Sequence, residues 1–289
     1  MIWQTSRFRI DLARPRVMGI VNVTPDSFSD GGRHHEASAA FAHCDRLLEE
    51  GADILDIGGE STRPGAQMPD VAEELRRVLP VVRHAVGLGV PVSVDTSRPE
   101  VIEAALAAGA DIINDVRALQ WPGALAAVAA HGSAGVCLMH MQGQPATMQQ
   151  APSYHNVLAE VQAFLAGRLA QVRAAGIDAR RIVLDPGYGF GKTLDHNLQL
   201  FRGQASLLAL GQPLLVGWSR KGTLGQITGR PAGERLVASV AAALAALQHG
   251  ARIVRVHDVA ATVDAVKVWQ AAGLGELAPP EHNPQEDSP

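Results

Sequence analysis

Eight short apolar segments recur along the 289-residue chain, separated by stretches rich in Ala, Leu and Glu. The apolar segments lie at residues 17–23, 53–58, 91–95, 111–115, 135–140, 181–185, 213–218 and 252–257. Most are continuous apolar runs, a pattern typical of strands buried on both faces of a parallel sheet. Eight strand–helix units in a chain of this length predict a (β/α)8 barrel, with a doubly wound open sheet as the alternative.

The separating stretches have helical character and include residues 36–50, 70–86, 154–175 and 234–249. Residues 96–100 (TSRPE) offer a hydroxyl cap and a proline for the first turn of a further helix. No linker rich in Pro, Gly or Ser divides the chain. We therefore expect one domain over residues 1–275 and a flexible, polar, Pro-rich tail over residues 276–289.

Composition narrows the class of protein. Lys and Arg total 25 against 29 Asp and Glu, which argues against a surface built to coat nucleic acid. Two cysteines are too few for a disulfide framework, so we expect reduced thiols. The N-terminal segment lacks an apolar signal core, and no run approaches the ~18 apolar residues of a membrane span. These features predict a cytoplasmic protein without membrane contact.

Polar or charged residues stand at the carboxyl end of each apolar segment. They are Asn22, Asp56, Asp95, Asn114, Asp115, His140, Asp185, Arg220, Lys221, Arg255 and His257. A single such Asp would more often be a helix cap, but capping does not account for all eight segments. In a barrel these ends converge on one mouth, where active sites lie. The mixture of carboxylates, amides and cations suits a ligand that has a hydrogen-bond-donating edge and an anionic part.

Two loops and two motifs add detail to this mouth. Residues 22–32 and 59–67 form long loops after the first two segments, as binding loops or lids do. Residues 185–193 resemble a phosphate loop, but Pro186 stands where the first glycine is required, so we reject triphosphate binding there. We expect its glycines to let the backbone approach a flat ligand. Residues 219–222 (SRKG) open a helix after the seventh segment, where barrels often bind phosphate.

Together these segments resemble the dihydropteroate synthases of the folate pathway. The resemblance rests on GIVNVTPDSFSDGG, GADILDIGGESTRPGA, VSVDTSRPEV, GADIINDV, LDPGYGFGKT, GWSRKG and RIVRVHDV, in this order. It implies a (β/α)8 barrel that joins p-aminobenzoate to a hydroxymethyl-dihydropterin diphosphate and releases pyrophosphate. It also implies a need for Mg²⁺, a homodimer and sensitivity to sulfonamides, which mimic p-aminobenzoate. We expect the late helices, around 234–249 and 258–272, to be candidates for the dimer interface.

The resemblance also assigns roles to individual residues of the pterin slot. Asp95, Asn114 and Asp185 would bind the donor edge of the pterin, and Lys221 its acceptor side. Val116 and Met139 would line the apolar side, with Arg255 against the ring face.

Further roles concern the diphosphate and the second substrate. Asn22, Arg63, Arg255 and His257 would surround the diphosphate, and Asn22 would also ligate Mg²⁺. Asp30 and Asp95 would stabilise a pterin-methyl cation in a dissociative reaction, so the predicted catalytic residues are Asp30, Asp95, Asp185 and Lys221. The p-aminobenzoate pocket would consist of Phe28, Thr62, Pro64, Phe190, Lys221 and Gly222.

One position departs from the family pattern. The family usually has Ser after the mouth lysine, whereas this chain has Gly222, so one hydroxyl hydrogen bond to the benzoate carboxylate would be absent. A methyltetrahydrofolate-dependent methyltransferase is the nearest alternative enzyme, although it would not need the SRKG and RVH anion-binding groups. A non-catalytic pterin-binding relative is the other alternative, and only Gly222 favours it.

Overall fold

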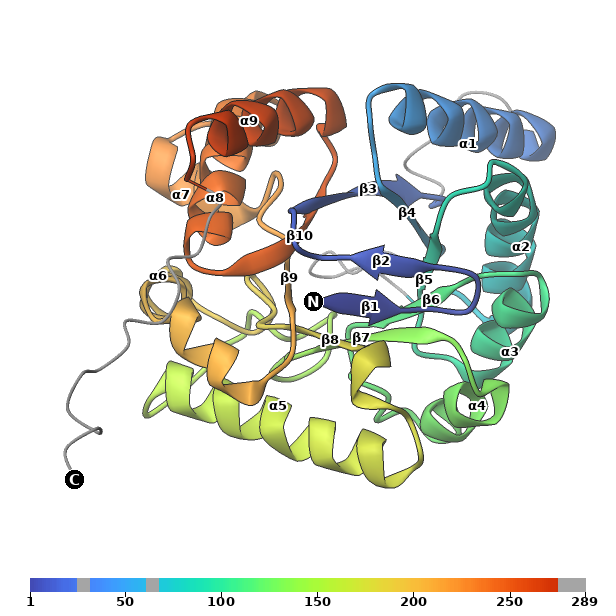
Figure 1. The fold of residues 1–289 in the computed structure, drawn as a ribbon, viewed down its shortest axis with the longest axis horizontal. Coiled ribbons are helices and arrows are strands. Elements are labelled where there is room, and N and C mark those ends of the chain that lie inside the picture. Colours follow the sequence, from blue (N-terminus) through green and yellow to red (C-terminus); the bar gives the residue numbers. More distant parts are fainter. Residues whose placement is uncertain (25–31, 61–67, 275–289) are drawn as a thin grey trace, which may run out of the picture.

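The computed structural model describes residues 1–24, 32–60 and 68–274, and these form a closed barrel of eight parallel strands (Figure 1). The strands are β3 (Arg16–Asn22), β4 (Ile54–Gly58), β5 (Val92–Asp95), β6 (Ile112–Asp115), β7 (Gly135–Met139), β8 (Ile182–Asp185), β9 (Leu214–Val216) and β10 (Ala251–Val256). They follow one another around the barrel in chain order, and β10 pairs with β3 to close it. All eight predicted strands and the (β/α)8 class are confirmed, and the open-sheet alternative is excluded.

Helices surround the strands. They are α1 (Gly32–Glu49), α2 (Val71–Gly87), α3 (Pro99–Ala107), α4 (Ala124–His131), α5 (Val157–Ala174), α6 (Leu194–Arg202), α7 (Gly222–Thr228), α8 (Leu236–Gln248) and α9 (Val259–Ala271). Pro99 begins α3 as predicted, but the expected hydroxyl cap is wrong, because the capping position is Arg98 and its side chain makes no cap bond. The hydroxyl of Thr96 instead donates to Glu74 at 2.6 Å.

A short hairpin that we did not predict covers the amino-terminal end of the barrel (Figure 1). It consists of β1 (Ile2–Gln4) and β2 (Arg9–Asp11), which pair in antiparallel fashion. Trp3 is fully buried, and its indole N–H donates to the carbonyl of Arg181 at 2.9 Å. Arg7 in the turn reaches Asp111 in front of β6, with 2.6 Å between Nη2 and Oδ2. The hairpin is therefore fastened to residues that precede two barrel strands.

Under the hairpin lies a layer of inward-facing apolar side chains. The residues of this layer are Met18, Ile54, Ile112, Cys137, Val183, Leu215 and Ile253. They pack with Trp3, Ile10 and Leu12 of the hairpin in one buried cluster. Side chains of a strand alternate between its two faces, so the residues two positions further along also point into the barrel. On four strands these are the polar residues Asp56, Asn114, Asp185 and Arg255, and on the other three they are Ile20, Met139 and Gly217. On four strands the interior of the barrel thus changes from apolar to polar within one step along its axis.

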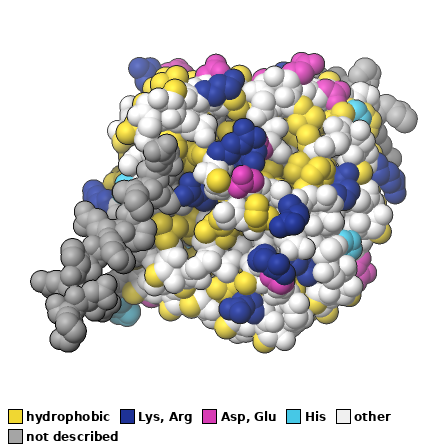
Figure 2. Space-filling view, viewed as in Figure 1, with side chains coloured by type: hydrophobic (Ala, Val, Ile, Leu, Met, Phe, Trp, Pro, Cys, Tyr) yellow, Lys and Arg dark blue, Asp and Glu magenta, His cyan; other side chains and the backbone are white. Residues whose placement is uncertain are grey.

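The face that carries the hairpin has basic side chains scattered among acidic and apolar ones (Figure 2). Both cysteines are free and buried, in accord with the expected thiols. None of the helices in the described ranges is long and apolar enough to cross a membrane. The expected tail over residues 276–289 and most of the two long loops lie outside the described residues.

Candidate active site at the carboxyl end of the barrel

A guanidinium held between two carboxylates lies at the centre of the mouth. Arg255 on β10 donates from Nε to Asp56 Oδ2 at 2.5 Å and from Nη2 to Asp95 Oδ2 at 3.0 Å. The amide of Asn114 on β6 donates to the same Asp56 oxygen at 3.2 Å. These four side chains come from four strands, and both carboxylates and the amide are buried. The structure therefore brings together three of the predicted site residues and adds Asp56.

The carboxylates of this cluster retain unused capacity to accept hydrogen bonds. Asp56 Oδ1 is buried and has no hydrogen-bond partner among the described residues. Burial raises the pKa of Asp95 to about 8, although the neighbouring Arg255 acts in the opposite direction. Burial also raises the pKa of Asp185, against the influence of Lys221. Buried acceptors of this kind are stabilised by a ligand that presents N–H donors.

Lys221, directly before α7, extends its amine toward the same space. Its Nζ donates to the carbonyl of Tyr188 and lies 4.7 Å from the centre of the Phe190 ring. The positive charge of Arg255 also acts on this amine, because it contributes to the lowered pKa of Lys221. Burial lowers the pKa of Lys221 to about 8, with Asp185 opposing the effect. The amine therefore lies near the Phe190 ring and within the electrostatic influence of the Asp185 carboxylate.

The glycines after β8 lie in close contact with neighbouring protein atoms. Gly187 has φ +70°, and a Cβ there would lie 1.8 Å from the carbonyl oxygen of His140 on the neighbouring loop. Gly189 has φ +80°, and a Cβ there would lie 3.0 Å from Cδ of Lys221. Only glycine fits such positions without strain. These glycines therefore allow close contacts with the His140 carbonyl and the Lys221 side chain, and the expected approach of a flat ligand stays a prediction.

The other predicted residues fall into clear groups. Val116 and Met139 are buried at the ends of β6 and β7, and Gly222 is exposed at the start of α7. Asn22 ends β3 opposite Gly58 of β4. The ring Nδ1 of His257 lies 3.0 Å from the Ser219 hydroxyl, which fixes its orientation beside the SRKG segment. Outside the described residues lie Phe28, Asp30, Thr62, Arg63 and Pro64.

Arg220 does not join the cations of the mouth. Its Nε donates to Asp258 Oδ2 at 3.0 Å, and its side chain is 47% exposed. Its backbone has φ +58°, an uncommon conformation for a residue other than glycine. The left-handed turn and the partner carboxylate separate Arg220 from Lys221, which the sequence places next to it.

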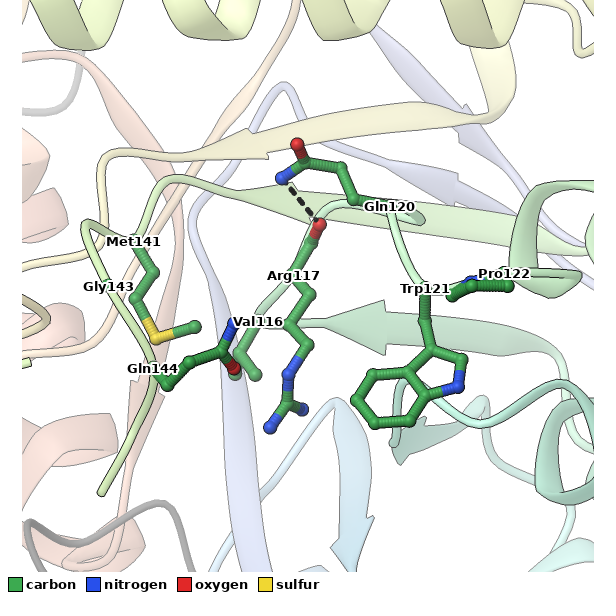
Figure 3. A pocket seen from close by; sticks show the side chains of 8 residues that line it. All are labelled: Val116, Arg117, Gln120, Trp121, Pro122, Met141, Gly143 and Gln144. Atoms are coloured by element: carbon green, nitrogen blue, oxygen red, sulfur yellow. Dashed lines mark hydrogen bonds between the residues drawn. The ribbon is translucent and has the colours of Figure 1, made fainter. Parts of the chain in front are cut away.

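A pocket of about 280 Å³ opens between the loops after β6 and β7 (Figure 3). Its lining consists of Val116, Arg117, Gln120, Trp121, Pro122, Met141, Gly143 and Gln144. The guanidinium of Arg117 lies 5.4 Å from the Trp121 ring and forms a buried ion pair with Glu60, 3.1 Å from Nη2 to Oε1. Only Val116 connects this pocket to the predicted site. The Arg117–Glu60 pair joins the loop after β6 to Glu60, two residues after the end of β4.

Sequence reasoning missed several residues of this region. Asp56 was recognised at a strand end but received no role, although its position two residues after Ile54 signals an inward direction. The Arg117–Glu60 pair joins residues 57 positions apart, and no local pattern reveals it. Lys192 was considered only as part of a rejected phosphate loop, yet it is buried beside His140.

Comparisons with known proteins agree with this geometry. Residues 18–257 match the model of the family described as pterin binding enzyme. The chain is 55% identical to the dihydropteroate synthase of Neisseria meningitidis serogroup B over 94% of this chain and 98% of that protein. The structure of Xanthomonas albilineans dihydropteroate synthase with 4-aminobenzoic acid is 56% identical and superposes with a TM-score of 0.87, covering 92% and 95% of the two chains.

A third relative has a drug bound. The Yersinia pestis dihydropteroate synthase in a sulfonamide complex is 48% identical, with a TM-score of 0.89 over 94% of this chain and 99% of that one. The family model matches most of the chain, and these relatives are matched over nearly their whole length. Both findings assign the chain to the same family. The chain belongs to the pterin binding enzymes and, within them, to the dihydropteroate synthases.

Proposed function

We propose that this chain condenses p-aminobenzoate with a dihydropterin-methyl diphosphate to give dihydropteroate and pyrophosphate, in the mouth of the barrel. One observation carries the proposal. Four strands bring two buried carboxylates, an amide and the Arg255 guanidinium into contact at the mouth, and the Lys221 amine is close enough for Arg255 and Asp185 to act on its charge. The relatives that share more than half of this sequence are dihydropteroate synthases, which carry out this reaction.

The pterin would occupy the space bounded by Asp95, Asn114, Asp185, Lys221 and Arg255. A pterin has a guanidine-like edge of N–H donors, and buried carboxylates accept such bonds strongly. Binding of those donors would favour the ionised form of Asp95 and Asp185, whose pKa values burial raises.

Val116 and Met139 supply an apolar wall, since both are buried at the ends of neighbouring strands. The planar guanidinium of Arg255 would stack against the face of the pterin ring. It would do so either in its present position or after leaving Asp56 and Asp95.

Mg²⁺ is part of the proposal, and the residues present fit it. Within the described ranges no three His, Cys, Asp or Glu side chains are grouped to hold a metal ion. Asn22 offers one neutral amide oxygen at the edge of the mouth. This suits Mg²⁺, which keeps several waters and takes few protein ligands beside substrate phosphates. When bound, the ion would neutralise charge on the diphosphate.

The protein's own groups would hold the leaving group and the second substrate. Arg255 and His257, with Arg63, would receive the diphosphate, and Ser219 fixes the His257 ring for this purpose. The bond between the pterin methylene and the diphosphate would break first, and Asp95 and Asp30 would stabilise the resulting cation. The aromatic amine then attacks without a strong base, because it is already neutral at pH 7. Phe28, Thr62, Pro64, Phe190, Lys221 and Gly222 would form the benzoate pocket, which a sulfonamide would also occupy.

A homodimer is proposed on a different observation. Large apolar side chains are exposed on α7, α8 and α9, which pack side by side (Figure 1). They include Ile227, Leu236, Val237 and Val268, with Val237 77% and Val268 70% exposed. A second copy of this chain would bury this surface. Val237→Glu with Val268→Glu should shift sedimentation from dimer to monomer; a dimer that persists would contradict this interface.

Release of pyrophosphate tests the proposed reaction. The enzyme is incubated with both substrates and Mg²⁺, and pyrophosphate and dihydropteroate are measured. Equal amounts of pyrophosphate and dihydropteroate support the proposal. Continued release of pyrophosphate should require p-aminobenzoate. Pterin binding by calorimetry without any product would favour a non-catalytic relative. Methyl transfer from methyltetrahydrofolate, measured in parallel, would favour the methyltransferase.

A further inference from the structure

Lysine is rare in this chain, and two of its lysines lie together in the interior. The sequence has 22 arginines but lysine only at positions 192, 221 and 267. Lys267 lies on α9 with a side chain that is 71% exposed. Lys221 belongs to the proposed site, whereas Lys192 is 3% exposed and has no part in the reaction described above. A buried lysine in a protein that otherwise prefers arginine calls for a physical explanation.

The amine of Lys192 lies in a cage of three acceptors. Nζ is 2.9 Å from the carbonyl oxygen of Gly187, 3.1 Å from that of Phe190 and 2.9 Å from Nδ1 of His140. Three acceptors match the three protons of an ammonium group. Two of them belong to the loop after β8, and the third comes from the end of β7. The amine therefore joins two neighbouring loops at the barrel mouth.

The loop segment that Lys192 holds also carries ligands of the pterin slot. The N–H of Gly187 donates to Asp185 Oδ1 at 2.7 Å, which orients that carboxylate. The carbonyl of Tyr188 accepts from Lys221, and the ring of Phe190 lies under the same amine. The two carbonyls held by Lys192 thus bracket the one that receives Lys221.

We propose that Lys192 is a positioning residue for the pterin slot, which holds the loop of residues 186–191 against His140 so that Asp185 and Lys221 meet the pterin in the required geometry. This inference rests on the proposed function. The amine of Lys192 contacts the carbonyls of Gly187 and Phe190 and the ring of His140, so it acts through the loop backbone.

The chemistry of the cage explains the choice of lysine. A compact ammonium group directs three donors to separate acceptors, whereas the planar guanidinium of arginine is larger and needs a flat arrangement. The charged groups that face this amine are Asp185, which attracts it, and Lys221, which repels it. Burial lowers the pKa of Lys192 to about 7, so the site bears the cost of a buried amine. An apolar residue of the same length would avoid that cost but would remove the donor from the Phe190 carbonyl and the His140 ring nitrogen, and the Gly187 carbonyl would keep only its bond from the Phe190 N–H.

The test compares Lys192→Met with Lys267→Met in the full-length enzyme. Methionine retains most of the aliphatic stem but removes all three donors. Calorimetry with 6-hydroxymethyl-dihydropterin should show at least tenfold weaker binding for Lys192→Met and wild-type binding for Lys267→Met. The kinetic effect should appear mainly in the KM for the pterin substrate. Binding within twofold of wild type in a folded Lys192→Met variant would overturn the proposal.

The state of Lys221 supplies a readout that a merely structural role would not change. Protein labelled with ¹³C at the ε-carbon of lysine should give three resonances, which the two variants and Lys221→Ala assign. In Lys192→Met the Lys221 resonance should shift, because its acceptor on Tyr188 moves, while the Lys267 resonance stays in place. An unchanged Lys221 resonance would show that Lys192 does not position it.

His140 variants keep the proposal testable if Lys192→Met does not fold. His140→Leu removes one of the three acceptors, and His140→Asn retains one at a similar place. The expected result is about threefold to tenfold weaker pterin binding for His140→Leu and smaller loss for His140→Asn. Equal binding by both variants and wild type would contradict the cage. Pyrophosphate release by the wild-type enzyme tests the proposed function independently, so failure of one proposal is distinguishable from failure of the other.

Discussion

The two ends of the barrel use the same strands for opposite purposes. At the amino-terminal end, inward residues such as Ile54, Ile112 and Val183 form an apolar layer beneath the hairpin. Two positions further along, the inward residues are Asp56, Asn114 and Asp185. Since alternate residues of a strand share a face, a single step along four of the strands separates the apolar layer from the polar layer that we propose binds the pterin.

The energetic character of the two layers differs accordingly. Apolar side chains under Trp3 gain free energy by leaving water. The polar layer loses solvation, which appears in the raised pKa of Asp95 and the lowered pKa of Lys221. Burial of apolar side chains at the hairpin end therefore offsets the solvation free energy that the polar groups of the mouth lose. Mutations at the hairpin end should change stability, and mutations at the mouth should change activity.

The largest expected effect is on stability at the hairpin end. Trp3→Ala removes a fully buried aromatic side chain and should lower the free energy of unfolding by about 3–5 kcal/mol. Trp3→Phe, which loses the bond to the Arg181 carbonyl but keeps a ring, should lower it less. Denaturant unfolding measures both. Turnover per folded molecule should remain near wild type, and a large loss of kcat in folded Trp3→Ala would break the separation of the two ends.

The next effect is on activity at the mouth. Lys221→Ala should lower kcat/KM about 100-fold, equivalent to about 2.7 kcal/mol, because it removes the amine between Asp185 and Phe190. Unfolding free energy should change little, since burial already disfavours this charge. Steady-state assays at varied pterin and p-aminobenzoate measure the loss. Wild-type turnover would remove Lys221 from the site.

A smaller effect concerns the pH dependence of stability. Burial and Lys192 lower the pKa of His140 to about 3, so the folded protein keeps this ring neutral in mild acid. The unfolded chain binds a proton below a pKa of about 6.5, and stability therefore falls as pH drops through that value, by about 2 kcal/mol between pH 7 and pH 5.

The free energy of unfolding of His140→Asn, measured at pH 7 and pH 5, should not show this fall of about 2 kcal/mol. His155→Asn, at an exposed histidine, serves as the matched control and should behave as wild type. If His140→Asn and wild type show the same pH dependence of stability, the buried neutral ring of His140 does not contribute to the loss of stability in acid.

The smallest effect is expected at Gly222. A Cβ there meets no atom within 4 Å, and φ is not in the left-handed region, so serine fits without strain. Gly222→Ser should lower the KM for p-aminobenzoate by about tenfold, since a hydrogen bond to a charged group contributes about 1.5–3 kcal/mol and this exposed position favours the lower figure. Sulfonamide inhibition measured alongside should shift in the same direction. An unchanged or higher KM would contradict a missing hydroxyl contact.

Sequence patterns revealed those features that depend on local order. The eight strands were predictable because continuous apolar runs bounded by polar residues are typical of buried parallel strands. The convergence of Asp95, Asn114 and Asp185 followed from the barrel class alone. Residues 2–11 gave no such signal, because the hairpin is short and becomes stable only against the barrel end it covers.

Other features depend on contacts between distant residues. The pairing of Arg220 with Asp258 turns a predicted mouth cation away, and no pattern in SRKG shows this. Gly187 packs against the carbonyl of His140, which lies 47 positions earlier on the neighbouring strand's loop, and no local pattern reveals this contact. Likewise, the cage of Lys192 consists of two carbonyls and one ring that only the folded barrel brings together.

Pterin binding by Asp185→Asn tests most directly whether the polar layer is the pterin slot. The substitution keeps the size of the side chain and the apolar layer beneath it, but it replaces a charged acceptor by a neutral amide. Calorimetry with 6-hydroxymethyl-dihydropterin should show binding at least about 30-fold weaker than wild type, or about 2 kcal/mol, with no loss of thermal stability. Binding equal to that of wild type would place the pterin elsewhere and contradict the division of the barrel into two ends.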